Sequence, residues 1–420
     1  MKDILMIAYH FPPVRVSSGI QRTLKFSQYL LSYNWRALVL TVKPMAYENI
    51  CDDQMLEVPD KIVVKRAFSL DTARHLTLKG RYFYWMSLPD RWVSWVFGGV
   101  IAGLGLINKY QPKFIWSTYP IATAHLIALI LHRISGIPWI ADFRDSMTEE
   151  NYPESPTKKK VYQWIEKKTV ENCYRAVFTT PGASQMYAER YPNVPACKWA
   201  VIPNGYDEEN FHRAEIKAIN QLRIERKSQK QIVLLHSGIL YPSERDPSIF
   251  FKALYELMGE GLVDLEGVKI VLRATAHDDL IKSLIIKFGI DNLVYIEPSV
   301  PYESALAEML TVDGLIVFQG SNCNHQIPAK IYEYLRAKKP IFALTDPIGD
   351  TASVLMDAKI NTISPLNDKD TIKNKFSEFL EGVRMRNAPI AKDECIRIHS
   401  REARTRLLAD LLNGYTKKIN

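Results

Sequence analysis

Residues 313–344 carry the pattern that most constrains the fold of this chain. A short apolar run rich in branched residues, Gly314–Phe318, is bounded by turn-forming residues, which is typical of a buried parallel strand. A polar loop follows, and Pro328 suits the first turn of a helix because a fixed φ helps there and the missing N–H would have no partner. Pro340 ends that helix, and residues 341–344 begin another strand. This order predicts an open α/β sheet.

Lys330 is the unusual residue of this stretch, because a cation in the first turn of a helix faces the positive end of the helix dipole. A bound anion would compensate for that placement. A phosphate held by helix N–H groups and by Lys330 would do so, and Glu333, one turn further on, is placed to bind the two hydroxyls of a ribose. The alternative is that both residues form an exposed polar stripe. A strand-loop-helix junction is where open α/β sheets bind ligands, so both interpretations stay open.

The chain has 420 residues, of which 47% are hydrophobic, which predicts two domains and a globular protein. A net charge of +8 and a pI near 9.0 favour anionic partners such as nucleotides, nucleic acid or an acidic membrane surface, or serve solubility alone. The apolar start is too short for a signal peptide. The cysteines are scattered without a CxxC pair, so neither a zinc site nor a disulfide framework is expected, and a reducing cytosol fits. They are Cys51, Cys173, Cys197, Cys323 and Cys395.

The N-terminal half alternates apolar strands with helices. The first strand leads into a loop that ends in Ser18-Gly19, where glycine lets a ligand approach the backbone closely. The fingerprint GxGxxG is absent, which counts against a nicotinamide or flavin oxidoreductase. The alternation predicts a doubly wound domain. Its expected strands are residues 4–8, 37–41, 62–65, 114–117, 138–142, 176–180 and 199–202.

Residues 81–108 contain an apolar run, 92–107, that is shorter than the roughly 20 residues needed to span a bilayer. Its glycines and tryptophans, with Arg81, Arg91 and Lys109 at the flanks, fit a buried helix of the first domain. They also fit a helix that rests on a membrane surface. Both interpretations stay open from the sequence.

Polar residues follow two of the predicted strands of the first domain. Thr118 ends one strand, and Asp142, Arg144 and Asp145 end the next. Charges at a strand end are unfavourable to bury unless they bind something, so these residues are candidates for the acceptor side of a cleft. A structural salt bridge of Arg144 with a neighbouring carboxylate is the alternative. His125 is a weaker candidate, because it is also expected to pack on its own helix.

The first domain is expected to span residues 1–205, since Pro203-Asn204-Gly205 is a strong turn. The charged segment 206–231 has no strand of its own and is interpreted as a linker. A second doubly wound domain is predicted for residues 232–398. A basic amphipathic helix, residues 399–420, is expected to pack back on the first domain.

Five motifs in order along the chain resemble glycosyltransferase family 4. They are HFPP with SGIQR near the start, ADFRD, VIPNGYDEENF, HSGILYPSERDP and IPAKIYEYLRAKKPI. The resemblance covers nearly the whole chain. It implies a GT-B fold, in which two Rossmann-like domains face each other, the second binding a nucleotide-sugar and the first an acceptor. It also implies sugar transfer with retained anomeric configuration and without a metal.

The resemblance assigns roles to single residues. Gly19 becomes the small residue near the donor diphosphate, Arg245 and Lys330 the catalytic cations on the leaving diphosphate, and Glu333 the carboxylate on the ribose. Further donor-side candidates are Asn204, Ser237, Gly238 and His325.

The chain departs from the family pattern at several positions. His325 stands where the family usually has a glutamate, eight residues before Glu333, and it either bonds the donor sugar or merely ends a loop. Ile239 replaces an arginine of the second-domain loop. In the first domain, Arg144 or Asp142 stands about where a histidine is expected, so no residue is assigned to the acceptor hydroxyl.

The predicted function is therefore a cytoplasmic glycosyltransferase that uses a UDP- or GDP-linked sugar, needs no cofactor or metal, and acts on a lipid-linked saccharide at the inner membrane face in cell-surface polysaccharide assembly. A sugar-nucleotide epimerase and a non-catalytic GT-B-like partner protein are the alternatives. Nucleic-acid binding is not expected, because no basic stripe with interleaved aromatic residues is present.

Overall fold

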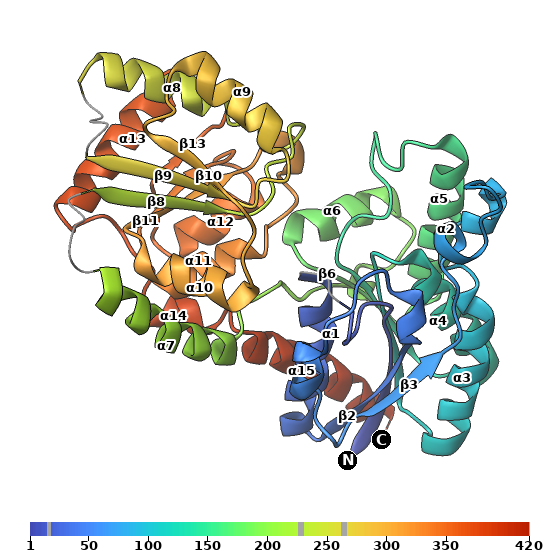
Figure 1. Cartoon of the computed structure of the whole chain (residues 1–420). Coiled ribbons are helices and arrows are strands. Elements are labelled where there is room, and N and C mark those ends of the chain that lie inside the picture. Colours follow the sequence, from blue (N-terminus) through green and yellow to red (C-terminus); the bar gives the residue numbers. More distant parts are fainter. Residues whose placement is uncertain (15–17, 226–230, 262–266, 420) are drawn as a thin grey trace. The chain divides into compact units, whose positions relative to one another are not determined.

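Two compact units make up the chain. A computed structural model describes residues 1–14, 18–225, 231–261 and 267–419. The first unit comprises Met1–Asn204 together with Arg401–Asn420, and the second comprises Gly205–Ser400. Each unit is an open parallel sheet with helices on both faces, so the predicted pair of doubly wound domains is confirmed (Figure 1).

The first unit is built on a seven-stranded parallel sheet with the order β3-β2-β1-β4-β5-β6-β7. Ile4 of the central strand pairs with Ala37 on one side and with Phe114 on the other. The strand order therefore reverses between β1 and β4, and open α/β sheets bind ligands at the carboxyl ends of the strands at such a point. The strands are β1 (Lys2–Ile7), β2 (Trp35–Val42), β3 (Val63–Ala67), β4 (Phe114–Thr118), β5 (Trp139–Phe143), β6 (Arg175–Phe178) and β7 (Trp199–Val201).

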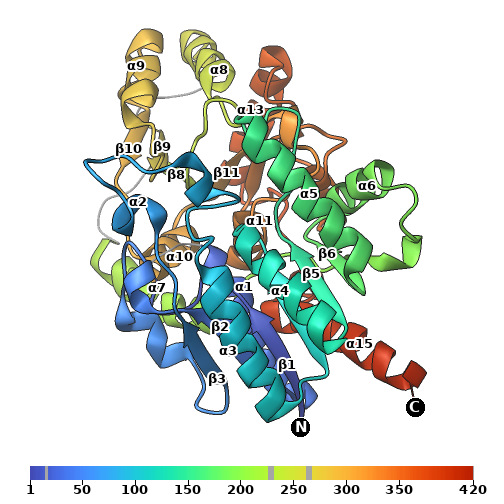
Figure 2. The same cartoon turned by 90° about the vertical axis from the view of Figure 1, so that its right-hand side faces the viewer.

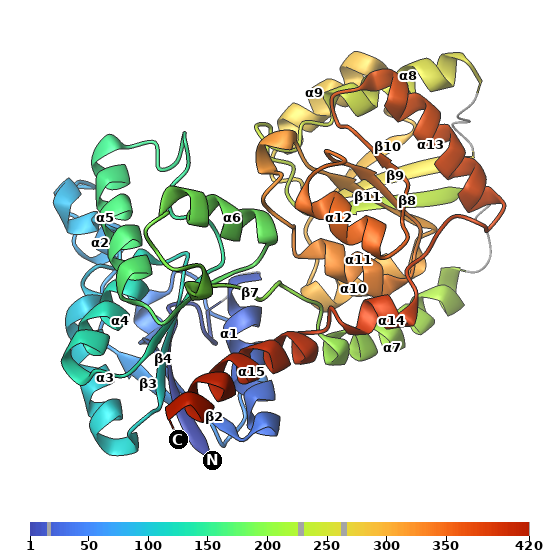
Figure 3. The same cartoon turned by 180° about the vertical axis from the view of Figure 1, so that it is seen from behind.

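Helices α3, α4 and α5 cover one face of this sheet, and α1 and α15 lie on the opposite face (Figures 1 and 3). The central strands β4 and β5 are therefore buried along their whole length and carry large apolar side chains on both faces. The helices of the first unit are α1 (Ser18–Tyr29), η1 (Leu30–Tyr33), η2 (Pro44–Ala46), η3 (Asp52–Glu57), α2 (Thr72–His75), η4 (Tyr84–Ser87), α3 (Trp95–Tyr110), α4 (Ala122–Ser135), α5 (Pro156–Asn172), α6 (Pro181–Arg190), η5 (Ala196–Lys198) and α15 (Arg401–Ile419).

The second unit has a six-stranded parallel sheet with the order β10-β9-β8-β11-β12-β13. Its order reverses between β8 and β11, which pair through Gly314 and Leu234. Gly314 allows this close approach, because a Cβ atom there would lie 2.8 Å from a methyl carbon of Leu234. The strands are β8 (Ile232–Ser237), β9 (Val268–Arg273), β10 (Val294–Glu297), β11 (Gly314–Phe318), β12 (Ile341–Leu344) and β13 (Ile363–Ser364).

Two apolar cores flank the second sheet. Helices α8, α9 and α13 cover one face, and α7, α10, α11 and α14 lie on the other (Figures 1 and 3). The helices of this unit are α7 (Glu208–Glu225), α8 (Ser248–Gly259), α9 (Asp278–Phe288), α10 (Tyr302–Thr311), η6 (Ser321–Cys323), α11 (Lys330–Ala337), α12 (Asp350–Asp357), α13 (Lys369–Arg384) and α14 (Asp393–Arg397).

The segment 206–231 differs from the linker predicted for it. Most of it is helix α7, which belongs to the second unit. Phe211, Ala214 and Ala218 share one face of this helix and are buried in a core with α10 and α11. Arg336 of α11 also forms ion pairs with Glu208 and Glu215. The charged residues around this narrow apolar stripe hide it in the sequence.

The apolar segment 81–108 becomes helix α3 and the loop before it. Gly99 and Gly103 let α3 lie close to α4, because a Cβ atom at these positions would lie 2.6 Å from Ile127 and 2.5 Å from Leu131. One face of α3 is thus a packed face of the first unit (Figure 2). Within the part of the chain that the structure describes, no helix is long and apolar enough to cross a bilayer.

Candidate donor site

The carboxyl ends of β8 and β11 bring the predicted donor residues of the second unit together. Strand β8 ends at Ser237 and is followed at once by Gly238. Strand β11 ends at Phe318, and the loop after it leads to α11, which begins at Lys330. Because β8 and β11 are parallel neighbours at the point where the strand order reverses, these two loops lie at the same edge of the sheet.

The amine of Lys330 lies directly against the backbone of Gly238. A Cβ atom at position 238 would be 2.5 Å from Lys330 Nζ, and Gly238 has a φ of +129°. The positive φ favours glycine, and any side chain there would also displace the Lys330 amine. The sequence motif around Gly238 therefore makes room for the cation at the start of α11.

The environment of Lys330 disfavours its positive charge. Burial and, next, the nearby Arg245 lower the pKa of Lys330 to about 7, while Glu333 acts in the opposite direction. Arg245 and the start of α11 thus place two cations close together, where each disfavours the charge of the other. A bound diphosphate would restore the balance there.

His236 is a further member of this group that sequence reasoning did not single out. Its imidazole is fully buried, with Nε2 3.5 Å from Lys330 Nζ and Nδ1 3.0 Å from the Ile316 carbonyl oxygen. Burial and then Lys330 hold the pKa of His236 well below its ordinary value, so the ring is neutral. Nε2 also lies 3.2 Å from the Gly238 carbonyl oxygen, so the neutral ring donates either from Nδ1 to Ile316 or from Nε2 to Gly238, and only the first tautomer lets Nε2 accept from Lys330.

Arg245 lies in the loop between β8 and α8 and is anchored within that loop. Its Nη1 donates to the Ile239 carbonyl oxygen at 3.0 Å, and its guanidinium lies 5.5 Å from the centre of the Tyr241 ring. A guanidinium carries five N–H donors, so this single bond leaves most of the fork available to a phosphate.

Glu333 stands one turn into α11 and is held by a tyrosine. Tyr302 is the first residue of α10, and its hydroxyl donates to Glu333 Oε1 at 2.6 Å. The sequence offered no signal for this contact, because Tyr302 precedes Glu333 by 31 positions. The carboxylate is thereby fixed one helix turn after Lys330 and is placed to accept bonds from a diol.

The remaining donor-side candidates are placed differently. Ser237 contributes its backbone N–H to the Tyr334 hydroxyl at 2.9 Å, and His325 lies in the loop before α11. Asn204 belongs to the first unit, where its carbonyl oxygen accepts a bond from Arg404 Nε at 3.3 Å. Of these three, Ser237 and His325 share the strand edge with Lys330.

Gly19 lies beside His10 and Arg144, at the carboxyl edge of the first sheet. A Cβ atom at Gly19 would be 3.2 Å from His10 Nδ1 and 3.4 Å from Arg144 Nη1. Burial and, next, Arg144 lower the pKa of His10 to about 4, so this ring is also neutral. The Nε of Arg144 is buried and has no hydrogen-bond partner within the described residues. Arg144 is thus paired with no carboxylate there and lies against His10 and Gly19.

Asp142 and Thr118 serve the interior of the first unit. The Asp142 carboxylate is fully buried and accepts two bonds from Arg22, at 2.9 Å from Nε and 2.7 Å from Nη2. Thr118 Oγ1 donates to the same carboxylate at 2.8 Å. Arg22 also donates to the Ile202 carbonyl oxygen, so the pair joins α1, β5 and the end of β7. This geometry assigns Asp142 a structural role, whereas Asp145 is exposed.

His125 is likewise part of the core. Its ring is fully buried among Tyr119, Trp139 and Phe143, and its Nδ1 lies 2.8 Å from Ser117 Oγ. Burial lowers the pKa of His125 to about 3. The ring is neutral and faces no solvent, so His125 cannot contact an acceptor substrate in this structure.

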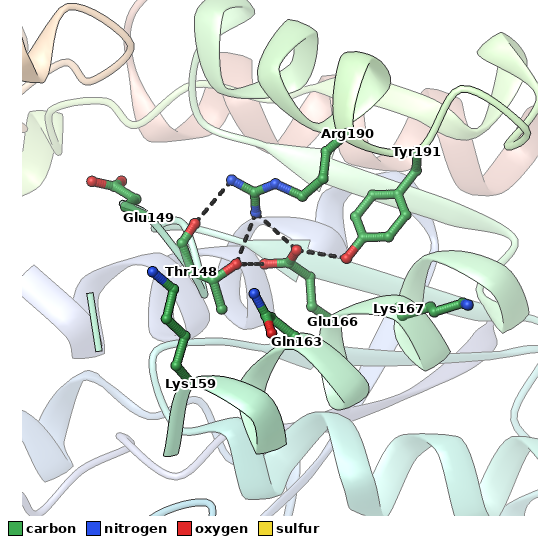
Figure 4. A pocket seen from close by; sticks show the side chains of 8 residues that line it. All are labelled: Thr148, Glu149, Lys159, Gln163, Glu166, Lys167, Arg190 and Tyr191. Atoms are coloured by element: carbon green, nitrogen blue, oxygen red, sulfur yellow. Dashed lines mark hydrogen bonds and ion pairs between the residues drawn. The ribbon is translucent and has the colours of Figure 1, made fainter. Parts of the chain in front are cut away.

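A separate pocket of about 410 Å³ opens on the first unit, and Figure 4 shows its lining. Glu166 accepts bonds from Arg190 Nη1 at 2.8 Å, from the Tyr191 hydroxyl at 2.7 Å and from Thr148 Oγ1 at 3.2 Å. These groups satisfy one another, which is typical of a structural network. None of the predicted site residues lines this pocket, whose lining is Thr148, Glu149, Lys159, Gln163, Glu166, Lys167, Arg190 and Tyr191.

A search of the described residues finds no group of three or more His, Cys, Asp or Glu side chains that could hold a metal ion. Whether turnover needs a metal therefore stays a prediction.

Comparison with known proteins agrees with this fold. Residues 64–205 match the family described as glycosyl transferase 4-like domain. No curated protein sequence matches the chain significantly. Among solved structures, sucrose-phosphate synthase from Thermosynechococcus elongatus is 14% identical, with a TM-score of 0.70 and all of both chains covered.

Two further structures are similar over the full length. Anabaena HepE in complex with UDP-glucose is 14% identical, with a TM-score of 0.66, 99% of this chain covered and 100% of HepE. The UDP-GlcNAc 2-epimerase of Neisseria meningitidis is 10% identical, with a TM-score of 0.57, 98% of this chain covered and 100% of the epimerase. The paired parallel sheets and these similar structures show a GT-B fold, and residues 64–205 are similar to the glycosyl transferase 4-like domain.

Proposed function

We propose that the protein is a retaining, metal-independent glycosyltransferase that binds a nucleotide-sugar on its second unit. Lys330 and Arg245 neutralise the leaving diphosphate, and Glu333 binds the ribose. The donor is a UDP- or GDP-linked sugar, and the acceptor is a lipid-linked saccharide in the assembly of a cell-surface polysaccharide. The protein acts in the cytoplasm, at the inner face of the membrane.

The placement of the Lys330 amine against Gly238, beside Arg245 and the neutral imidazole of His236, supports this proposal most strongly. This arrangement favours the binding of an anion. Departure of a nucleoside diphosphate builds negative charge at that place. A preorganised donor aimed at developing charge typically contributes about 3 to 4 kcal/mol to the transition state.

The comparisons support a uridine donor as the first to test. The similar HepE structure holds UDP-glucose, which is a property of that protein. In this chain, α11 begins with Lys330, which suits a diphosphate, and has Glu333 one turn later, which suits the hydroxyls of the attached ribose. The thermal-shift screen described below identifies the base and the sugar of the donor.

The acceptor side of the proposal draws support from the first unit and from the net charge. Arg144 lies at the carboxyl edge of its sheet, beside Gly19 and the neutral ring of His10. The chain carries a net charge of +8, which favours a negatively charged membrane surface.

A thermal-shift screen over uridine, guanosine and cytidine sugar nucleotides tests the donor assignment. A ligand present at 100 times its Kd adds about 2.7 kcal/mol of stability, which is readily measured as a higher melting temperature. One nucleotide class should stabilise the wild-type protein, while Lys330→Ala and Glu333→Ala should keep the wild-type melting temperature without ligand and lose the ligand response. If both variants respond as wild type does, the assigned site is incorrect.

Product analysis tests the chemistry. With an acceptor extract, transfer should continue in excess EDTA, and proton NMR of the product should show the anomeric configuration of the donor. Loss of transfer on chelation, with recovery on adding a divalent cation, would contradict the metal-independent mechanism.

A sugar-nucleotide epimerase is the second candidate, because an epimerase with this fold is similar over the whole chain. Incubation of the donor without acceptor separates the two. An epimerase would give an isomeric sugar nucleotide, whereas a transferase would leave the donor unchanged or release the free diphosphate slowly.

A further inference from the structure

The loop before α3 exposes an unusual number of large apolar side chains. Leu78, Phe83 and Trp85 are 81%, 70% and 69% exposed, and Tyr82 and Tyr84 are 41% and 49% exposed. Residues 78–85 are called the aromatic loop below. Such a contiguous apolar surface is uncommon on a monomer and marks an interaction site.

The aromatic loop has a defined conformation. Leu78 and Arg81 exchange two backbone hydrogen bonds, of 2.8 and 3.1 Å, around Lys79 and Gly80, which have φ values of 51° and 74°. The rings of Phe83 and Trp85 are stacked, with centroids 6.4 Å apart and planes inclined by 22°. The two rings thus pack against each other and stay exposed instead of folding onto the core.

A hydrogen bond fixes the aromatic loop to the start of α5. The Tyr84 hydroxyl lies 2.5 Å from Ser155 Oγ, and Ser155 itself caps α5 by accepting a bond from the Lys158 N–H. The loop is therefore presented on a helix of the first unit, and its polar tyrosine edge faces protein while Phe83 and Trp85 face solvent.

The charged residues within the aromatic loop and next to it in the sequence are of one sign. From Thr72 to Pro89 the sequence contains Arg74, Lys79 and Arg81 and neither Asp nor Glu. Lys79 and Arg81 are exposed beside the aromatic residues. Arg74 instead donates to the Tyr47 carbonyl oxygen.

The adjoining segment carries both signs. Lys158, Lys159 and Lys160 begin α5, and the preceding residues include Glu149, Glu150 and Glu154. These charges largely balance. The net positive charge at this place thus comes from the aromatic loop itself.

We propose that the aromatic loop docks on an anionic lipid bilayer. Phe, Tyr and Trp side chains prefer the interface between hydrocarbon and water, where the ring is buried and the polar atom stays wet. Lys79 and Arg81 lie among the lipid phosphates, to which cations next to inserted apolar residues are attracted. A hydrophobic protein partner would be served by the rings alone, whereas the one-signed charge beside them matches an acidic membrane surface.

This inference deepens the peripheral location in the proposed function by naming the surface that makes the contact. It predicts binding to lipid in the absence of donor and acceptor, because the aromatic loop contains none of the donor-site residues. Failure of the docking surface and failure of the donor site can therefore be told apart.

Co-sedimentation of the full chain with large vesicles tests the proposal. Vesicles of neutral phosphatidylcholine are compared with vesicles that contain one third phosphatidylglycerol. The wild type should bind the anionic vesicles at least tenfold more strongly. Phe83→Ser/Trp85→Ser should weaken that binding at least tenfold, and Lys79→Glu/Arg81→Glu should abolish the preference for anionic lipid.

The control variant is Tyr255→Ser/Ile286→Ser, which removes two exposed apolar side chains of the second unit, 57% and 74% exposed, and should bind as wild type does. All variants should keep the wild-type melting temperature and donor response, because the changed side chains are exposed and lie outside the donor site. Light scattering of each protein without vesicles measures whether it is a monomer or an oligomer.

Three results would overturn the inference. They are an absence of wild-type binding to either vesicle, equal binding by the wild type and Phe83→Ser/Trp85→Ser, and a wild-type oligomer that Phe83→Ser/Trp85→Ser dissociates to monomers. The last would show that the aromatic loop contacts a second copy of the chain.

Discussion

Lys330 is the residue whose environment is least suited to its own charge. Its amine is pressed against Gly238, lies 3.5 Å from a neutral His236, and has Arg245 as a neighbouring cation. Functional sites commonly hold groups with such shifted pKa values. The arrangement stabilises the free protein little, and it becomes favourable when a diphosphate occupies the site.

The lowered pKa of Lys330 predicts how donor affinity depends on pH. With a pKa of about 7, Lys330 loses its proton in the free protein as the pH rises through 7. The diphosphate binds the protonated form, so the Kd for a nucleotide-sugar should rise from pH 6 to 8.5 and approach a tenfold increase per pH unit above 7. Titration calorimetry across this range measures it.

Lys330→Arg is the control for this dependence, because an arginine keeps its charge throughout the range. Its Kd should be nearly independent of pH, while a pH-independent Kd in the wild type would contradict the assigned pKa. The same shift affects folding: the unfolded chain holds the Lys330 proton up to about pH 10. This residue therefore makes the free protein more stable as pH rises from 7 toward 10.

Some of the donor site was visible in the sequence and some was not. Lys330 stood out because a cation is unusual in the first turn of a helix, Glu333 followed from its place one turn further on, and Arg245 followed from a resemblance. His236 looks like an ordinary strand residue in the sequence. Its contact with Lys330 could not be predicted, because the two residues are 94 positions apart. His125 and Asp142 could not be separated from functional residues, because polar groups at strand ends serve ligands and buried networks alike.

At the scale of elements, the sequence predicted strands better than the surface helices. The predicted limits of β11 and β12 agree with the structure, because fully buried strands are short apolar runs with turn residues at both ends. Helix α7 was missed, since only Phe211, Ala214 and Ala218 mark its buried face among many charges. A narrow apolar stripe becomes visible only once its partner helix is known.

The ion pair of Arg22 and Asp142 joins elements that are distant in the sequence, and it predicts a large loss of stability. Both side chains are buried, at 2% and 0% exposure. Arg22→Leu leaves a buried carboxylate without its partner, which should lower the free energy of unfolding by about 3 to 5 kcal/mol. Urea denaturation of the purified variant measures it.

Two comparisons make this prediction specific. Arg36→Leu removes another two-bond contact with a carboxylate, Asp3, but Arg36 is 31% exposed, so the loss should stay below about 1 kcal/mol. The double variant Arg22→Leu/Asp142→Leu should recover part of the stability lost by Arg22→Leu. Equal losses for Arg22→Leu and Arg36→Leu would show that burial of the pair is not what matters.

On the scale of the whole molecule, the chain leaves the first unit at Asn204 and returns to it at Arg401. The returning helix α15 buries Leu408, Ala409 and Leu412 in the core of the first unit. The sequence indicated this return through a basic amphipathic pattern. It placed the limits of the second unit less well, because α7 resembles a linker by composition.

Removal of residues 401–420 should therefore destabilise the first unit. Burying a large aliphatic side chain contributes about 1.5 to 3 kcal/mol, so losing Leu408 and Leu412 together removes several kcal/mol. Hydrogen exchange read by mass spectrometry should show faster exchange in β1, β2 and α1 and unchanged exchange in β8 to β12. Faster exchange in the second unit alone would contradict this division of the chain.

The central claim is that Lys330 and Arg245 bind the diphosphate of a nucleotide-sugar. Titration calorimetry tests it most directly, with the sugar nucleotide that gives the largest thermal shift, in excess EDTA, against the wild type, Lys330→Ala, Arg245→Ala and the exposed controls Lys252→Ala and Arg384→Ala. A charge-assisted hydrogen bond contributes about 1.5 to 3 kcal/mol, so Lys330→Ala and Arg245→Ala should each bind at least tenfold more weakly than the wild type and the controls. Equal affinities in all five proteins would contradict the claim.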